Sequence, residues 1–399
     1  MRSTRRIAGI LICLVACRGR SPSAQSIGQH QLEALVDSLL PSVSQATGLA
    51  FKSTPRSAVR TREQIRAYLV AKMQRELPAA RLEGIGDAYR LLGMISDTVD
   101  LRQLFLELYT EQIAGFYDPD STTLFAVQGG DPTQLRLVLA HELVHALQHQ
   151  YLPLDSILHD STDSDDQAAA QAVLEGQATL ASLVALVPGM DLKTNDTFWA
   201  TFREQLRAQQ SGTTVYARAP MVIREGLTFP YVDGAEFMRW FDRNHPGEVP
   251  FGPRMPKSTE QILHPDHYAG GDAPVRVRLD GDTAGVILDD TFGEFDIDLL
   301  RAALIHAANV QTDSVLGWGG DRLRIYRSAT GPALVWVTVW DDARSADGFQ
   351  RLIATPLSHS PRVGYRVAVD PLTVAGKSAV RIVIAPSGWA RWTALPGAG

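Results

Sequence analysis

The residues with the clearest chemical potential are two histidines four positions apart, His141 and His145, with Glu142 directly after the first. They lie in a largely apolar stretch that begins at Asp131-Pro132-Thr133 and predicts a helix reaching about Gln150. Residues four apart share one face of a helix, so both imidazoles can bind a single metal ion. Glu142 emerges about 100° away, beside the metal, where it can act as a base.

A catalytic zinc site needs a third protein ligand and an open position for water. Glu175, in Val173-Leu174-Glu175-Gly176-Gln177-Ala178, is the preferred candidate. An acidic residue among apolar neighbours is costly to bury unless a cation neutralises it. Gly176 also indicates that two helices pack closely here. The alternatives are an exposed Glu175 on a solvated helix face, with His159 or Glu236 as the third ligand.

Both motifs resemble those of the gluzincin metallopeptidases, which combine HExxH with a downstream glutamate ligand. Residues 175–178 are similar to the EGxA form found in bacterial peptidases of the MA clan. The likeness spans about residues 111–180, and the segment from Gly115 to Val127 resembles the strand that precedes the active-site helix in such proteins. The resemblance implies a zincin-like fold with one catalytic Zn²⁺ held by His141, His145 and Glu175, and Glu142 as the catalytic base.

The expected function is zinc-dependent hydrolysis of peptide bonds in a protein or peptide substrate. Gln148 and Tyr151 stand where a metzincin would have Gly and His, and a Gly-x-Met-Glu-Asn exopeptidase motif is lacking, which favours an endopeptidase. A donor for the oxyanion is also needed. Tyr231 and His264 are preferred to His267 and Tyr268 for this role.

The competing interpretation is a non-catalytic, zinc-stabilised lipoprotein that acts as a binding or envelope-assembly factor. Such a scaffold would need the metal ligands but not the base, so an intact Glu142 favours the enzyme. A structural lipoprotein without any metal is a third possibility.

The N-terminus predicts export. Arg2, Arg5 and Arg6 precede an uncharged, mostly apolar run, Ile7–Ala16, that is too short to span a bilayer and is typical of a signal peptide. The run ends in Leu14-Val15-Ala16-Cys17, which resembles the bacterial lipobox. This resemblance implies cleavage after residue 16, lipid on Cys17 and attachment to a bacterial membrane, facing the periplasm or the cell exterior. An ordinary cleaved signal peptide with a chance cysteine is the alternative.

The elements that must position these residues predict an α+β fold. After the signal peptide (1–16) and a lipid-anchored tether (17–28), we expect a mainly helical zincin-like catalytic domain over 29–272 and a smaller α+β domain over 273–399. Thr61 and Gln64 form a capping-box pattern that begins one helix. Two β-prone runs around the turn at 118–121 predict a hairpin, and 122–127 either forms an edge strand that binds an extended peptide or covers the core.

Composition narrows the function classes further. The 399-residue chain is 45% hydrophobic and 21% charged with a net charge of −6, which excludes a disordered polymer and makes nucleic acid an unexpected partner. With Cys13 removed in the signal peptide and Cys17 lipidated, we expect no disulfide. The acidic run from Asp155 to Asp166 is expected to cap the following helix rather than bind calcium. Trp336 and Trp340 share a strand face and are expected in the core.

Overall fold

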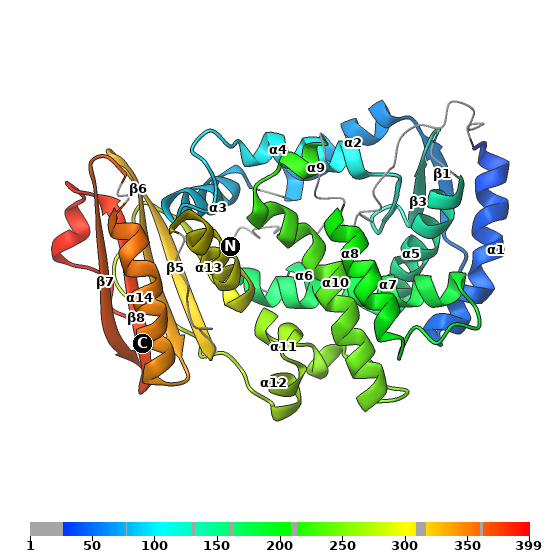
Figure 1. Cartoon of the computed structure of the whole chain (residues 1–399). Helices are drawn as coiled ribbons and strands as arrows, with labels where there is room; N and C mark the ends of the chain where they lie inside the picture. The colour runs from blue at the N-terminus through cyan, green and yellow to red at the C-terminus, as the bar shows by residue number, and fades with distance from the viewer. Residues whose placement is uncertain are drawn as a thin grey trace.

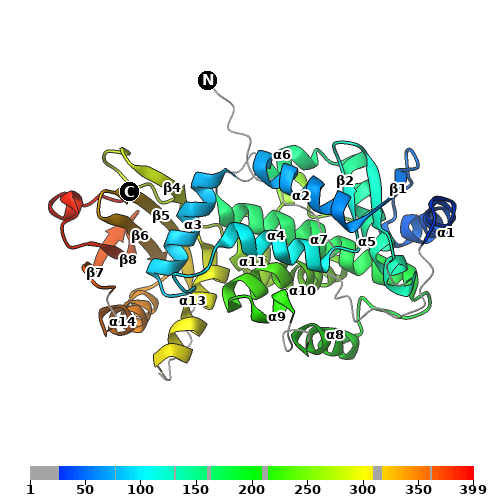
Figure 2. The ribbon, with the colours of Figure 1, turned by 90° about the horizontal axis from the view of Figure 1, so that it is seen from above.

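The computed structural model describes residues 27–76, 78–129, 132–159, 163–208, 214–308, 317–359 and 362–399. The predicted signal peptide, Cys17 and nearly all of the predicted tether lie outside the described residues. The structure is α+β, as the sequence predicts, with one small and one larger sheet. Figures 1 and 2 show an elongated molecule, with α1 (Gln29–Thr47) and the small sheet at one end and the larger sheet at the other.

Helices dominate the part before residue 272. The larger ones are α2 (Arg62–Glu76), α3 (Ala79–Leu91), α4 (Leu101–Gln112), α5 (Pro132–Tyr151), α7 (Ser164–Leu186), α8 (Asp196–Ala208) and α10 (Met221–Asn244). The shorter ones are α6 (Leu154–His159), α9 (Val215–Arg218), η1 (Gly252–Arg254), α11 (Thr259–Leu263) and α12 (Pro265–Gly270).

Local signals in the sequence begin several of these helices. The Thr61 backbone N–H donates to Gln64 Oε1 at 3.0 Å, and the Gln64 N–H donates to Thr61 Oγ1 at 3.3 Å, which is the predicted capping box at the start of α2. Asp100 caps α4 by accepting a hydrogen bond from the Gln103 N–H at 3.0 Å. These caps satisfy backbone donors that the first turn of a helix leaves without partners.

The small sheet contains the predicted hairpin and one additional strand. β2 (Gly115–Asp118) and β3 (Thr123–Val127) are antiparallel, and β1 (Arg56–Arg60) pairs with β3 in parallel, giving the order β1–β3–β2. The interpretation of 122–127 as an edge strand is therefore wrong, because the unforeseen β1 covers its outer side. The hairpin strand that lies at the edge of the sheet is β2, and it packs against α5.

Three long helices form the centre of the N-terminal part. α7 lies between α5 and α10, and all three are seen close together in Figure 1. Among the described residues, α7 is the one helix long and apolar enough to cross a membrane, but 72% of its most apolar window is buried inside the protein. Most of its apolar surface is thus buried against neighbouring elements, as in the core of a helical protein.

The larger sheet has five antiparallel strands in the order β4–β5–β6–β8–β7, with α13 (Gly293–Ala308) and α14 (Ala343–His359) beside it. The strands are β4 (Val286–Asp290), β5 (Trp318–Ser328), β6 (Gly331–Trp340), β7 (Tyr365–Val374) and β8 (Lys377–Pro386), and the short η2 (Ala390–Thr393) follows them.

Both faces of this larger sheet are buried. Side chains alternate along β6, so Leu334, Trp336 and Trp340 belong to one core cluster and Val335 and Val337 to another. Trp336 and Trp340 are completely buried, which confirms their expected place in the core. The Trp336 cluster also takes in residues of α3 from the N-terminal part. One core cluster thus spans both parts of the chain, while other clusters belong to one part alone.

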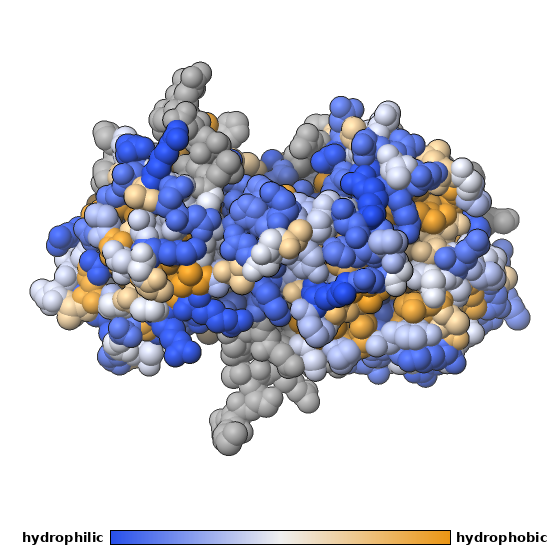
Figure 3. Space-filling model, turned by 90° about the horizontal axis from the view of Figure 1, so that it is seen from below, coloured by the Kyte–Doolittle hydropathy of each residue, from blue (hydrophilic) through white to orange (hydrophobic). Residues whose placement is uncertain are grey.

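The surface is mainly hydrophilic on the face seen in Figure 3, where apolar residues form small, separate patches. Few large apolar side chains are exposed among the described residues, and Val363 is the most exposed of them. Scattered apolar residues of this kind are normal on a folded protein and do not by themselves mark a binding surface.

Candidate metal centre

Helix α5 brings His141 and His145 together on one buried face. Their Nε2 atoms lie 3.0 Å apart, and the side chains are almost completely shielded from solvent. The helix itself is anchored by Leu139, Leu143 and Leu147, which are fully buried. The apolar residues of α5 therefore bury the helix, and its four-residue spacing points two nitrogen donors at one place.

Helix α7 supplies the third group. Glu175 Oε2 lies 2.9 Å from His141 Nε2 and 3.3 Å from His145 Nε2. Glu175 has no exposed surface, and the three ligand atoms form a cluster that could hold a metal ion. The structure thus brings together the three residues that the sequence predicts as ligands.

The electrostatics of this cluster suit a cation. Burial alone would raise the pKa of Glu175, but His145 and His141 next to it hold that pKa well below its usual range. Burial lowers the pKa of His145, and the carboxylates of Glu175 and Glu142 more than reverse this effect. Glu175 is thus held ionised chiefly by positive charge on His145, whereas burial lowers the pKa of His141. In addition, its Oε1 has no hydrogen-bond partner within the described part of the chain. A metal ion would neutralise the carboxylate directly, so the donor set fits one.

Glu142 lies beside the three ligands and is held by the small sheet. Its Oε2 accepts a hydrogen bond from the Tyr117 backbone N–H at 2.7 Å, and the side chain is fully buried. Tyr117 belongs to β2, the strand at the sheet edge nearest α5. The hydrogen bond fixes the carboxylate in one position next to the cluster. The sequence predicts Glu142 as a base, but it does not reveal Tyr117 as its support.

Gln148 is a supporting residue that the sequence analysis missed. His145 Nδ1 lies 2.8 Å from Gln148 Oε1, while Gln148 Nε2 donates to the Leu174 carbonyl oxygen and to Gln177 Oε1, both at 2.9 Å. An amide oxygen is an acceptor, so a His145 that gives up its Nε2 proton to bind a metal keeps the other proton on Nδ1 and directs its Nε2 lone pair to the cluster. The signal was present as a glutamine three residues after His145, on the same side of the helix.

The two proposed oxyanion donors lie in different surroundings. The Tyr231 ring on α10 lies 5.8 Å from the His141 ring, measured between centroids. His264 Nε2 instead lies 3.2 Å from Glu294 Oε2, and its ring is 5.3 Å from that of His267. Tyr231 is therefore the one of the two that is placed against a candidate ligand.

Glu236, one of the two alternative ligands, lies outside the cluster. Glu236 forms ion pairs with Arg239 at 2.6 Å and with Arg203 at 3.0 Å. His149, the next histidine along α5, is not among these alternatives, and its Nδ1 lies 2.8 Å from the Tyr117 hydroxyl oxygen. The side chain of His159 lies outside the described residues.

The acidic run before α7 contributes structural contacts. Asp165 Oδ1 accepts hydrogen bonds from the Thr259 N–H at 2.8 Å and from its hydroxyl at 2.6 Å, which ties α7 to α11. Asp163 is the N-cap residue of α7, but it makes no side-chain cap and pairs instead with Arg322 at 2.5 Å. These two carboxylates thus connect α7 to later parts of the chain. Residue 160 lies outside the described ones.

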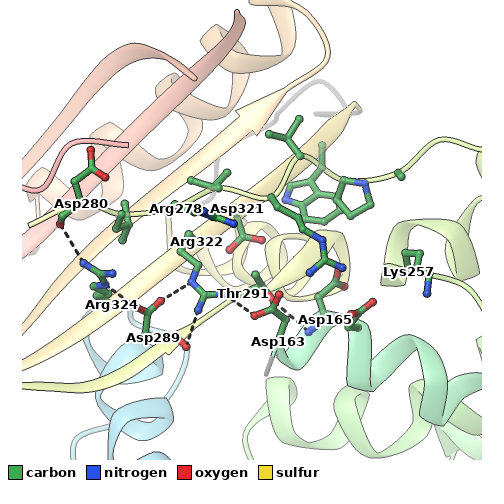
Figure 4. A pocket seen from close by; sticks show the side chains of 18 residues that line it. Asp163, Asp165, Lys257, Arg278, Asp280, Asp289, Thr291, Asp321, Arg322 and Arg324 are labelled. Carbon is green, nitrogen blue, oxygen red and sulfur yellow. Dashed lines mark hydrogen bonds and ion pairs between the residues drawn. The ribbon is translucent and has the colours of Figure 1, made fainter. Parts of the chain in front are cut away.

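A cavity of about 560 Å³ lies between the start of α7, the segment 273–280 and strands β4 and β5 (Figure 4). Its walls carry charges of both signs, many of them paired with one another. Arg322 and Arg324 both contact Asp289, and Arg324 also donates to the Asp280 carbonyl oxygen at 3.1 Å. None of the residues of the metal cluster lines this cavity.

Comparison with known proteins adds one local match. A family model described as a domain of unknown function (DUF8575) matches residues 276–388. This segment lies in the C-terminal part and contains none of the residues of the metal cluster. No curated protein and no solved structure matches the chain.

Proposed function

We propose that the protein is a zinc-dependent peptidase that hydrolyses internal peptide bonds. The observation that supports this most strongly is the convergence of His141 Nε2, His145 Nε2 and Glu175 Oε2 with the buried Glu142 beside them. Two imidazole nitrogens and one carboxylate oxygen are a donor set that catalytic zinc uses, with a fourth position left for water or substrate.

Bound zinc would supply Lewis-acid polarisation of the scissile carbonyl and of the attacking water molecule. The chain supplies the proton transfers. Glu142 takes a proton from the water on its carboxylate and then passes it to the leaving amine. The Tyr117 N–H at 2.7 Å holds the carboxylate in place during both steps. We further propose that the Tyr231 hydroxyl donates a hydrogen bond to the developing oxyanion.

The presence of a base argues for an enzyme rather than a zinc-stabilised scaffold. A structural zinc site needs its ligands and the residues that orient them, but a fully buried carboxylate next to the ligands would add only a desolvation cost. The backbone hydrogen bond from Tyr117 offsets part of that cost while keeping the carboxylate available. Such an arrangement is useful if the carboxylate handles protons.

The deciding experiment compares wild type with Glu142→Gln. The amide oxygen can still accept the Tyr117 hydrogen bond, so the variant should fold and keep its zinc, but it cannot accept a proton. Hydrolysis should fall by about 10²–10⁴-fold. A proteome-wide search for peptides produced by wild type and not by the variant would identify the substrates. Glu204 is an exposed glutamate on α8, so Glu204→Gln is the matched control. Equal cleavage by wild type and Glu142→Gln would contradict the mechanism.

We also propose that the protein is a lipoprotein held to a bacterial membrane outside the cytoplasm through Cys17. The support is the N-terminal sequence alone, with its positive residues, its ten-residue apolar run and the cysteine that follows. Cys17→Ser should release the folded protein from membranes. Mass spectrometry of the mature N-terminus tests this directly, since an unmodified N-terminus downstream of Cys17 would refute the anchor.

A further inference from the structure

A second group of metal-ligand side chains lies where α11, α12 and α13 meet. Glu260 on α11, His267 on α12 and Asp272 just after α12 place one ligand atom each within 4.8 Å of one another. His267 Nδ1 lies 3.3 Å from Glu260 Oε1 and 3.4 Å from Asp272 Oδ2. The three atoms therefore surround one small space.

Glu260 is the residue that points to a ligand there. Its side chain is only 1% exposed, and its Oε1, which faces His267, has no hydrogen-bond partner within the described part of the chain. The Nδ1 atom of His267 likewise lacks one. The two atoms approach each other without forming a hydrogen bond. Buried polar atoms without partners are rare because each costs about 1–3 kcal/mol, so an unaccounted partner is expected.

The charges around Glu260 favour a cation as that partner. Glu294 on α13 is also buried, and its Oε2 lies 3.2 Å from His264 Nε2 without a hydrogen bond to any described residue. The carboxylates of Glu294 and Asp272 lie near the buried Glu260, so the negative charges of the three groups repel one another when all are ionised. Such a set of carboxylates is stable only when protons or a cation offset the repulsion.

We propose that Glu260, His267 and Asp272 bind a second divalent metal ion, separate from the His141 cluster. The imidazole selects the class of metal. Calcium and magnesium prefer oxygen ligands alone, whereas zinc and manganese accept an imidazole nitrogen together with carboxylates. Glu294 and His264 lie next to the three ligands and complete the polar surroundings of the ion.

This ion would stabilise the junction between the two parts of the chain. α11 is hydrogen-bonded to the start of α7 through Thr259 and Asp165, and the Phe295 N–H of α13 donates to Thr259 Oγ1 at 3.2 Å. α7 carries Glu175, and α13 covers the larger sheet. A metal bound by Glu260, His267 and Asp272 would stabilise the contacts of α11 with α7 and α13 without taking part in the chemistry at His141.

The test is a count of bound metal in the whole protein at controlled free zinc or manganese. Wild type should bind two ions per chain, whereas His267→Ala and Asp272→Asn should each bind one. Both residues are only partly buried, so their replacement should leave the fold intact, which circular dichroism checks. Asp266→Asn removes an exposed carboxylate from the same helix and should still bind two ions.

A melting curve provides a second measurement. Added zinc should raise the melting temperature of wild type and Asp266→Asn by more than that of Asp272→Asn. An unchanged metal count in both His267→Ala and Asp272→Asn would overturn the proposal, as would stabilisation by calcium alone. These counts do not depend on peptidase activity, so they test the second site even if no substrate is ever cleaved.

Discussion

Gly176 and Gly234 are in backbone contact where α7 crosses α10. A Cβ on Gly176 would lie 2.2 Å from the carbonyl carbon of Gly234, and a Cβ on Gly234 would lie 2.1 Å from the carbonyl oxygen of Ala172. No side chain larger than hydrogen fits at either position without moving a helix. Because Gly176 directly follows Glu175, this contact also sets how far the carboxylate reaches toward His141 and His145.

We therefore predict that Gly176→Ala destabilises the protein and weakens metal binding together. Overpacking of a close helix contact costs about 1–3 kcal/mol in the free energy of unfolding. Gly226→Ala is the control, since nothing lies within 4 Å of its Cβ position on α10 and alanine favours a helix. Urea denaturation measures both variants. Equal stability of Gly176→Ala and Gly226→Ala would contradict the proposed contact.

Glu175 should be required for tight metal binding. Glu175→Ala removes one of three donors and leaves a cavity between α5 and α7, so both zinc affinity and stability should fall. Glu175→Gln keeps the shape and should retain the fold with weaker binding. Zinc titration against a competing chelator gives the affinities. A metal-bound structure in which the ion contacts His141 and His145 but not Glu175 would end this assignment.

Gln148 should act through His145 rather than on the metal. Gln148→Leu removes the acceptor for His145 Nδ1 and the donor to the Leu174 carbonyl oxygen, so zinc affinity should fall about 10–100-fold. Gln148→Glu keeps an acceptor and should recover part of the affinity. An exposed glutamine on α4, replaced as Gln103→Leu, is the control. If Gln148→Leu bound zinc as tightly as wild type, the orienting role would be excluded.

Tyr231→Phe tests the proposed oxyanion donor. The phenylalanine ring preserves the contact with the His141 ring but removes the hydroxyl, so kcat should fall about 10²–10³-fold with little change in KM or zinc content. Tyr268→Phe is the comparison, because the Tyr268 hydroxyl donates to the Arg254 carbonyl oxygen at 2.8 Å. A larger loss in Tyr268→Phe than in Tyr231→Phe would reverse the assignment.

Asp296 should make stability depend on pH. Burial, with a smaller contribution from Asp321 and Asp290, raises the pKa of Asp296 to about 7. An unfolded aspartate titrates near pH 4, so from about pH 4 to 7 the folded protein binds this proton more tightly than the unfolded chain. The free energy of unfolding should therefore fall as the pH rises through this window.

In the wild type, the Tyr89 hydroxyl donates a hydrogen bond to Asp296 Oδ1 at 3.1 Å. Asp296→Asn removes the titrating carboxyl group, and its amide oxygen can still accept this hydrogen bond. As the pH rises from 5 to 8, the free energy of unfolding of the variant should fall by less than that of wild type, and the two falls should differ by roughly 1–3 kcal/mol. Denaturation at both pH values measures the difference, with the exposed Asp347→Asn as control. Parallel pH profiles for Asp296→Asn and wild type would show that this carboxyl group titrates normally.

Sequence alone determined the features that depend on neighbours along the chain. The four-residue spacing of His141 and His145 places both imidazoles on one face of any helix, whatever surrounds it. The capping box of Thr61 and Gln64 and the turn after Asp118 are equally local, and the structure contains both. Gly176 predicted a close helix contact because glycine inside a helix is costly unless close packing needs it.

Tertiary structure decided which distant segments meet. β1 lies more than sixty residues before β3, and nothing local in either strand specifies their pairing, so the identity of the edge strand could not be read from the chain. The hydrogen bond from Tyr117 to Glu142 and that from Gln148 to the Leu174 carbonyl oxygen depend on how β2 and α7 pack against α5. The grouping of Glu260, His267 and Asp272 arises in the same way. Burial and packing across long separations, rather than local propensity, bring such groups within bonding distance.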